Sequence, residues 1–149
     1  MNKEEAVAAL SVVVKSKWED AKKAFDTSRA GATSDQSKQE GKYDTRSVEE
    51  AYLAHGLANA VVEYEKALAD LENCRQLEAT PEVSVGSLIC CKRDGEGVSF
   101  LLSHSGGGIE AEVNGEEVII ITPESPLAKK LLSKAAGERA GAFVVKGIL

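Results

Sequence analysis

Residues 53–74 read LAHGLANAVVEYEKALADLENC, and their apolar spacing decides the fold of the first half of the chain. Apolar or small side chains recur at alternating steps of four and three residues, which is the spacing of one stripe on a helix. Gly56 is the weakest point of this run for a helix. The pattern predicts a long helix with a stripe made by Leu53, Leu57, Ala60, Tyr64, Ala67, Leu71 and Cys74.

The partner for this stripe lies upstream, in residues 3–29. Apolar side chains recur there at helical spacing, and neither Pro nor Gly interrupts the stretch. Helices of ~27 to 30 residues are ~40 to 45 Å long, and neither can hide its stripe alone in so small a protein. The two helices are therefore expected to pair, with an upstream stripe made by Leu10, Val14, Trp18, Ala21 and Phe25.

The segment between the two helices, residues 31–45, reads GATSDQSKQEGKYDT and is small and polar. Such a composition predicts the turn of an antiparallel helical hairpin, called the tip loop below. It carries the carboxylates of Asp35, Glu40 and Asp44. The end of any hairpin is solvated, so these charges need no function. Alternatively, a narrow arm that ends in carboxylates suits insertion into another molecule.

The chain changes character near Thr80-Pro81, after which Gly, Val and Ile dominate. Strands are predicted at 83–93, 98–103, 109–113, 117–122 and 142–149. Asp94-Gly95-Glu96-Gly97 and Asn114-Gly115 are hairpin signals between neighbouring strands. The strands are expected to form a twisted antiparallel sheet. The predicted fold class is therefore α+β, with a helical hairpin at 1–79 and a small sheet domain at 80–149.

One helix is predicted inside the sheet domain. Ser125 is a preferred N-cap residue and Pro126 suits the first helical position. Gly137 is expected to end the helix as its C-cap. Leu127, Ala128, Leu131 and Leu132 share one face, so the helix should cover the sheet.

Composition excludes several classes of protein. The chain has 149 residues, 43% apolar and 28% charged, which is typical of one globular domain or two small ones. No apolar run reaches the ~18 to 20 residues of a membrane span, and the first residues do not resemble a signal peptide, so a cytoplasmic protein is expected. The net charge of −6 argues against direct nucleic-acid binding and favours a protein partner.

No self-contained active site is visible in the sequence. The cysteines, Cys74, Cys90 and Cys91, form no CxxC pair and are expected to be reduced packing residues, with a metal or redox role as the alternative. His55 and His104 have no partner at metal-ligand spacing, so no metal of the chain's own is expected. Residues 106–108 are three glycines without phosphate-loop spacing, and the consecutive residues 103–105 (SHS) cannot face one another as a nucleophile and its base.

The chain resembles the bacterial Gre transcript cleavage factors, GreA and GreB. The resemblance covers a long N-terminal hairpin with an acidic tip, a linker, and a sheet domain that contains ITPESPLAKKLL at residues 121–132. Val85-Gly86-Ser87, which opens the first strand, supports it. The resemblance implies an FKBP-like C-terminal domain that docks at the rim of the RNA polymerase secondary channel. It also implies a hairpin that enters this channel to modulate catalysis or RNA cleavage.

The resemblance further implies a role for the tip carboxylates. In the family, two tip acids three residues apart lie beside the catalytic magnesium of the polymerase, and such a pair can help to hold a second Mg²⁺ and orient water. Anchoring the comparison on the second helix places Gly41 and Asp44 at these positions, and anchoring it on Tyr43 places Gln36 and Gln39 there. In either register an ideal carboxylate is missing. Glu40 and Asp44, one helical turn apart, are then the surrogate pair, with Asp35 as a supporting group.

The resemblance places partner-binding residues at Ser125, Pro126, Leu127, Lys129 and Lys130. Lys92, Arg93, Lys129 and Lys130 are either solvated charges or contacts to an acidic rim. The chain is expected to be a monomer without intrinsic cofactor or catalytic activity, sharing at most Mg²⁺ with the polymerase and binding no specific DNA sequence and no membrane.

Two other functions are open. A coiled-coil adaptor or dimer would pair the first-half helices between chains. An FKBP-type peptidyl-prolyl isomerase would need an aromatic-lined pocket, for which residues 81–149 supply only Phe100 and Phe143.

Overall fold

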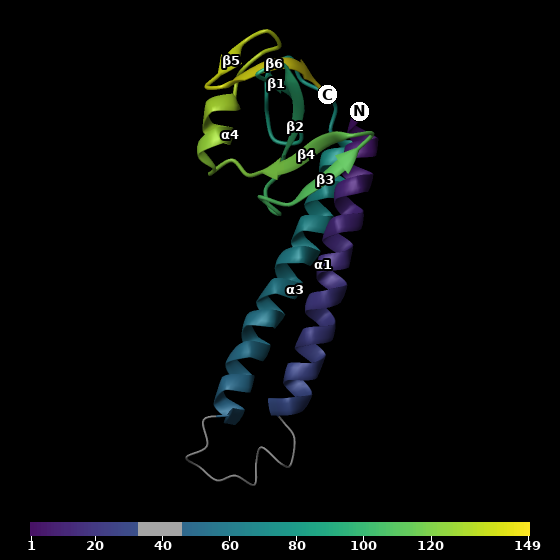
Figure 1. The fold of residues 1–149 in the computed structure, drawn as a ribbon, viewed down its shortest axis with the longest axis vertical. Helices are drawn as coiled ribbons and strands as arrows, with labels where there is room; N and C mark the ends of the chain where they lie inside the picture. The colour runs from purple at the N-terminus through teal and green to yellow at the C-terminus, as the bar shows by residue number, and fades with distance from the viewer. Residues whose placement is uncertain (33–45) are drawn as a thin grey trace. The chain divides into compact units, whose positions relative to one another are not determined.

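The computed structural model of the chain describes residues 1–32 and 46–149 (Figure 1). Two long helices, α1 (Lys3–Ala32) and α3 (Arg46–Gln76), precede a six-stranded sheet and the short helix α4 (Pro126–Leu131). The α+β class is confirmed. Residues 33–45 of the tip loop lie outside the described residues.

The described residues group into two compact units. One unit combines Met1–Val14 with Lys66–Leu149, so the first turns of α1 and the last turns of α3 belong with the sheet. The other unit is Lys15–Glu65. We call them the sheet unit and the helical unit. The predicted division in chain order, at residues 79 and 80, stays a prediction.

The two helices pair as an antiparallel hairpin, as predicted. In the sheet unit, the Lys3 ammonium donates a 2.7 Å hydrogen bond to the carbonyl oxygen of Leu77. In the helical unit, the Trp18 indole nitrogen donates a 3.1 Å hydrogen bond to a carboxylate oxygen of Glu65. The later residue of α1, Trp18, thus pairs with the earlier residue, Glu65, and this order shows that the two helices are antiparallel.

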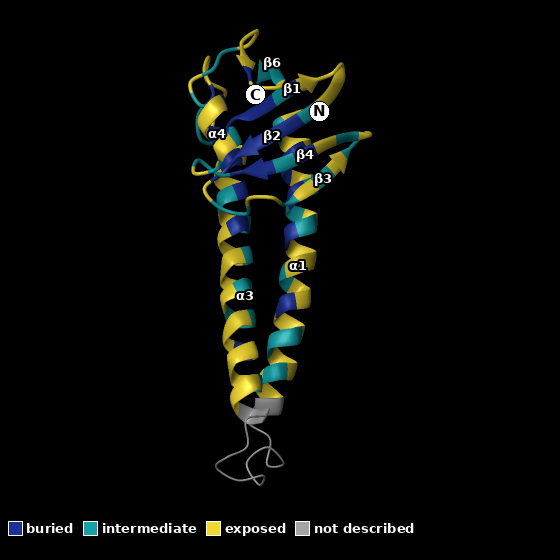
Figure 2. Cartoon of the chain, turned by 60° about the vertical axis from the view of Figure 1, so that its left-hand side comes forward, coloured by how far each residue is buried: buried dark blue, intermediate teal, exposed yellow. Residues whose placement is uncertain are grey.

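The predicted stripes are buried in the sheet unit and mostly half-buried in the helical unit (Figure 2). Leu10 and Val14 on α1 and Leu71 on α3 are fully buried. Leu53 is the exception, because 57% of its surface is exposed while Ala54 is buried, so its predicted place on the stripe is wrong. A straight helix drifts by ~20° per heptad relative to an exact seven-residue repeat. Over the three heptads between Cys74 and Leu53, this drift moves the face that contacts the partner helix from Leu53 towards Ala54.

The sheet has the strand order β3-β4-β2-β1-β6-β5. The strands are β1 (Leu88–Arg93), β2 (Glu96–Leu102), β3 (Glu110–Val113), β4 (Glu116–Ile121), β5 (Arg139–Ala140) and β6 (Phe143–Ile148). The predicted antiparallel arrangement is wrong for one pair, because β2 and β4 run parallel and the sheet is mixed. The hairpin β3–β4 pairs with β2 through β4 and not through β3. Because β3 and β4 are antiparallel, β3 in that place would be antiparallel to β2, whereas β4 is parallel to it.

Two hairpin turns lie where the sequence predicts them. Asp94 and Gly95 have φ values of 51° and 84°, and Asn114 and Gly115 have 53° and 82°. Two consecutive left-handed residues form the type I′ turn that matches the twist of two-residue hairpins. Each turn therefore fixes the register of its strand pair.

Several predicted elements begin or end at other residues in the structure. The first strand begins at Leu88 rather than at residue 83, and the last predicted strand is preceded by the separate short strand β5. Helix α4 ends at Leu131, and Ser133 behind it has a left-handed φ of 65°. The predicted C-cap role of Gly137 is therefore wrong. Instead, the Gly137 amide donates a 2.7 Å hydrogen bond to the carbonyl oxygen of Val145.

Both faces of the sheet are covered within the sheet unit. One face packs against α4 through a cluster that includes Phe100, Leu102 and Leu131, as predicted. On the other face, the loop after β2 approaches α3, because a Cβ at Gly106 would lie 3.2 Å from the Cβ of Ala67. Gly106 also has a φ of 80°, so this position needs glycine for both space and conformation.

Candidate functional site

Helix α4 begins with the residues that the sequence marks as partner-binding. The Ser125 hydroxyl accepts a 3.2 Å hydrogen bond from the Ala128 amide, and Pro126 occupies the first helical turn. Leu127 is half-buried against the core. Ser125 and Pro126 therefore have a structural role in starting the helix, whatever they contact outside the chain.

A basic groove lies between α4 and β5. Ala128 and Leu131 face the core, so Lys129 and Lys130 point to the surface. The groove has a floor of small or apolar residues and a rim of four basic side chains. Its lining is Lys129, Lys130, Leu132, Lys134, Arg139, Ala140 and Gly141.

The positive charge of this groove is only weakly neutralised by the residues around it. The 4.0 Å ion pair between Lys134 and Glu138 is partly exposed, and exposed pairs contribute little. Residues 124–149 contain five basic and two acidic residues, whereas the whole chain has a net charge of −6. A local basic surface on an acidic protein suits an acidic partner.

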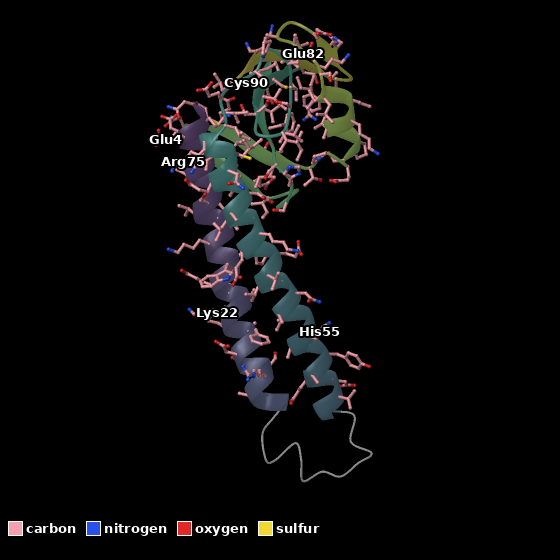
Figure 3. The ribbon with its side chains drawn as sticks, turned by 180° about the vertical axis from the view of Figure 1, so that it is seen from behind. Glu4, Lys22, His55, Arg75, Glu82 and Cys90 are labelled. Atoms are coloured by element: carbon pink, nitrogen blue, oxygen red, sulfur yellow. The ribbon has the colours of Figure 1, made fainter. Side chains whose placement is uncertain are left out.

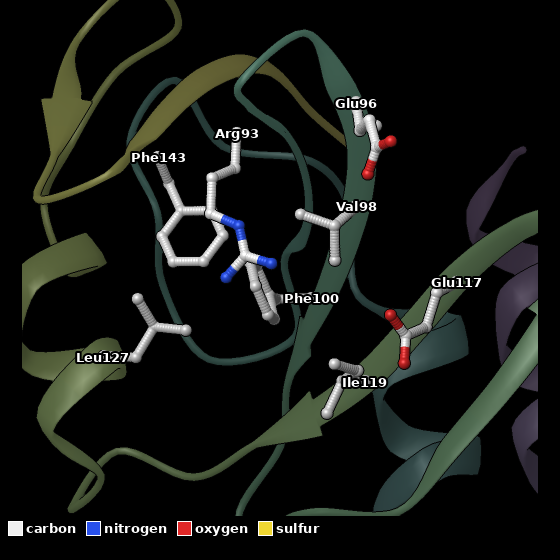
Figure 4. Close-up of a pocket in the computed structure, with 9 residues that line it drawn as sticks. Arg93, Glu96, Val98, Phe100, Glu117, Ile119, Leu127 and Phe143 are labelled. Carbon is white, nitrogen blue, oxygen red and sulfur yellow. The ribbon is translucent and has the colours of Figure 1, made fainter.

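A second concavity opens on the face of the sheet that carries α4, and we call it the Phe pocket (Figure 4). The rings of Phe100 and Phe143 meet edge to face with centroids 5.2 Å apart. The Arg93 guanidinium lies 5.5 Å from the centre of the Phe143 ring, a cation–π distance. The cavity has a volume of about 190 Å³ and is lined by Arg93, Glu96, Gly97, Val98, Phe100, Glu117, Ile119, Leu127 and Phe143.

The cysteines are free thiols, as expected, and two of them are buried. Burial, followed by the neighbouring charge of Cys90, raises the pKa of Cys91 from 9.0 to about 11. Burial is also the main cause that raises the pKa of Cys74. Because thiolate is the reactive form, Cys74 and Cys91 are poor nucleophiles at neutral pH.

A small cavity of about 180 Å³ surrounds Cys74, where α3 faces the end of β2. The Cys74 thiol donates a weak 3.8 Å hydrogen bond to the carbonyl oxygen of Leu102. Ser103 is buried, and its hydroxyl has no partner in the described part of the chain. The next hydroxyl, of Ser105, donates to a carboxylate oxygen of Asp70. The two hydroxyls thus have separate surroundings, and His104 between them is exposed.

The described residues hold no metal-binding cluster and no membrane helix. Within residues 1–32 and 46–149, His, Cys, Asp and Glu side chains form no group of three that could ligate a metal. His55 on α3 is exposed (Figure 3), as is His104. No helix in this part of the chain has the length and apolar character that crossing a bilayer requires.

The predicted tip residues Asp35, Glu40 and Asp44 lie outside the described residues, as do Gln36, Gln39, Gly41 and Tyr43. Their proposed roles stay predictions. Of the predicted site residues, the structure therefore describes only Ser125, Pro126, Leu127, Lys129 and Lys130.

The sequence interpretation missed two groups of residues. Lys134 and Arg139 join Lys129 and Lys130 in the basic groove, and the excess of basic residues after position 125 was the available signal. Phe100 and Phe143 were noted only as too few for an aromatic pocket. The two rings meet across β1, which lies between their strands β2 and β6, and both belong to the cluster that packs with α4. Predicting this contact requires knowledge of the strand order.

Comparison with known proteins gives structural matches only. No protein family model and no curated protein sequence matches the chain. The crystal structure of GreA factor homolog 1 (Gfh1) of Thermus thermophilus matches 95% of this chain and 95% of its own, with 16% identity and a TM-score of 0.34. A second structure, of the transcription factor Gfh1, matches 94% of this chain and 93% of its own, with 15% identity and a TM-score of 0.38. The match to a GreA homologue thus spans nearly the whole chain.

Proposed function

We propose that this protein is a regulator of transcription that binds RNA polymerase. The sheet unit docks on the polymerase through α4 and the basic groove, and the tip loop acts at the secondary channel. The protein itself is not an enzyme in this proposal, and at most stimulates RNA cleavage by the polymerase.

The observation that carries the proposal is the basic groove. The SPLAKKLL segment that underlies the sequence resemblance forms α4, and its two lysines line one groove with Lys134 and Arg139. Clustered, nearly unpaired cations on an acidic protein favour an acidic protein surface as the partner. The hairpin of α1 and α3 supports the other half of the proposal, since its two helices bracket the acidic tip loop.

The chemistry proposed for the tip depends on carboxylates that the sequence supplies. Asp and Glu oxygens are ligands that Mg²⁺ prefers, and a second ion beside the first can activate water for phosphodiester hydrolysis. Glu40 and Asp44 would provide these oxygens, with Asp35 as a supporting group. Without a convergent pair, the tip would instead occupy or reshape the channel and slow the reaction.

Docking is tested by charge reversal in the groove. The double variant Lys130→Glu/Arg139→Glu should weaken binding to RNA polymerase at least tenfold, because it replaces two attractive contacts by repulsive ones. Lys146→Glu, on an exposed position of β6 outside the groove, is the control. Binding by the double variant as tight as that of the unmodified protein would contradict the proposal.

The action of the tip is tested with backtracked transcription complexes. Stimulated RNA cleavage that is lost in Glu40→Ala or Asp44→Ala, but kept in Asp26→Ala on α1, would support recruitment of metal by the tip. Slower cleavage than polymerase shows alone would identify an antagonist. A protein that neither binds polymerase nor changes its cleavage rate is not a polymerase regulator.

A coiled-coil adaptor or dimer is the second candidate function, because α3 exposes large apolar side chains in the helical unit. They are Val48, Tyr52, Leu53 and Val62. Pairing of this face between chains would hide them. Sedimentation distinguishes the two functions, since the polymerase regulator is proposed to be a monomer.

A further inference from the structure

The Phe pocket has an apolar floor and charged walls of opposite sign. Val98, Ile119 and Leu127 come from β2, β4 and α4 and form the floor together with the two phenylalanine rings. Figure 4 shows the Arg93 guanidinium beside Phe143, while the carboxylates of Glu96 and Glu117 lie beyond Val98. The cavity thus separates one positive group from two negative groups.

These charges are available to a partner. Arg93, Glu96 and Glu117 are exposed, and none of them forms an ion pair with another described residue. Arg93 instead lies over the Phe143 ring, which limits its freedom before anything binds. A guanidinium held on a ring presents its N–H donors in a fixed plane that matches a carboxylate.

The size of the cavity selects what can fill it. Sites for whole small molecules usually measure about 300 to 1,000 Å³, whereas this one measures about 190 Å³ and accommodates a single apolar side chain. Burying one such side chain does not offset the translational and rotational freedom that a free small molecule loses. A segment of a protein adds contacts on both sides of its buried residue, so it suits the cavity better.

We propose that the Phe pocket binds a protein segment in which one apolar side chain stands between an acidic and a basic residue. The apolar side chain enters the cavity against Phe100 and Phe143. The acidic residue pairs with Arg93, and the basic residue pairs with Glu117. This inference does not depend on the basic groove, because the pocket and the groove share no lining residue, although Leu127 of the pocket belongs to α4.

The test uses capped peptides and the isolated full-length protein. Acetylated and amidated Ala-Glu-Leu-Lys-Ala and Ala-Lys-Leu-Glu-Ala are titrated while amide chemical shifts are followed by NMR. We expect saturable shifts at the residues that line the pocket, with a Kd on the order of 1 mM for the better of the two peptides. Arg93→Glu should raise the Kd of that peptide at least tenfold, and Glu117→Lys should raise it by a similar factor.

Matched variants separate the pocket from general electrostatics. Lys92→Glu changes the same charge on the neighbouring residue, which does not line the cavity, and should leave binding within twofold. The double variant Arg93→Glu/Glu117→Lys should prefer the peptide of reversed order. All of these positions are exposed, so the variants should keep the circular dichroism spectrum of the unmodified protein.

Several outcomes would overturn the proposal. One is that Ala-Gln-Leu-Gln-Ala binds as tightly as the better charged peptide, and another is that free leucine causes the same chemical-shift changes as that peptide. A third is that Arg93→Glu and Lys92→Glu change peptide binding equally. A fourth is that no saturable shifts occur at 10 mM peptide, on the order of ten times the expected Kd. Acceleration of prolyl isomerisation in a proline peptide would also overturn it, because the cavity would then be an active site.

Discussion

The two compact units bury their helices to different depths. In the sheet unit, α1 and α3 bury Leu10, Val14 and Leu71 completely. In the helical unit, the buried residues among those described are Ala21 and Ala54, each 9% exposed. The same two helices thus have a sheet to pack against in one unit and, among the described residues, only each other in the second. Most helical stability comes from packing of an apolar face, so the sheet unit should be the more stable of the two.

The largest effect is expected from truncating leucines along α3. Leu71→Ala, in the sheet unit, should lower the free energy of unfolding by about 3 kcal/mol because the site is fully buried. Leu57→Ala, two heptads earlier and half-buried, should cost about 1 kcal/mol, and Leu53→Ala less than about 0.5 kcal/mol. Urea denaturation followed by circular dichroism measures all three. Equal losses at Leu71 and Leu57 would remove the distinction between the units.

Alkaline pH should weaken the sheet unit selectively. The folded protein holds Cys91 as a neutral thiol with its pKa raised from 9.0 to about 11, so the stabilisation is complete below pH 9 and is lost as the pH rises towards 11. A rise in pKa from 9.0 to about 11 corresponds to about 3 kcal/mol. Urea unfolding between pH 8 and pH 11 should show a fall in the free energy of unfolding. In Cys91→Ala, the free energy of unfolding should depend less on pH over this range.

The control for this pH dependence lies in the helical unit. That unit contains no cysteine, and it holds Trp18, the one tryptophan of the chain. The transition reported by Trp18 fluorescence should therefore move less with alkaline pH than the transition reported by the sheet. Parallel movement of both transitions would indicate one cooperative body and contradict the comparison.

Two serine substitutions should have opposite signs. Ser125→Ala removes the N-cap of α4 in the sheet unit and should cost about 1 kcal/mol. Ser16→Ala, at an exposed position inside α1 of the helical unit, replaces serine by the better helix former and should stabilise by about 0.4 kcal/mol. Thermal melts of the two variants against the unmodified protein check both. A loss at Ser16 would mean that its hydroxyl makes a contact of its own.

The smallest effect is expected at the hydrogen bond between the helices of the helical unit. Glu65→Ala removes the acceptor of the Trp18 indole and should destabilise by about 0.5 kcal/mol, since the pair is exposed. Trp18 emission should shift in this variant and stay unchanged in Glu19→Ala, the control on α1. An unchanged spectrum in both variants would show that the bond does not persist in solution.

The sequence was sufficient for the elements that depend on local signals. Apolar spacing predicted both helices, Asp94-Gly95-Glu96-Gly97 and Asn114-Gly115 predicted the turns, and Ser125-Pro126 predicted the start of α4. The parallel pairing of β2 and β4 was not predictable in this way, because it depends on which strand of a hairpin meets a distant neighbour. The end of α4 was missed for a local reason, since Ser133 adopts the left-handed conformation that was assigned to a glycine.

The candidate sites follow the same rule. Lys129 and Lys130 share one helix, so the sequence placed them together, whereas Arg139 joins them through the short strand β5. Arg93, Glu117 and Phe143 come from three strands and meet only in the folded sheet. Residues brought together by topology are invisible to spacing arguments, while residues brought together by one helix are not.

The sheet unit is built from two separate segments of the chain, and this has a consequence for its folding during synthesis. Its first segment, Met1–Val14, is separated from its remaining part, Lys66–Leu149, by the whole helical unit. Ribosomes add about 5 to 20 residues per second, so roughly 3 to 10 s pass before the packing partners of Leu10 begin to be synthesised. During that interval an apolar turn of α1 has no native surface to cover it. Nascent chains halted before residue 66 should therefore recruit chaperones more strongly than chains that have been completed and released.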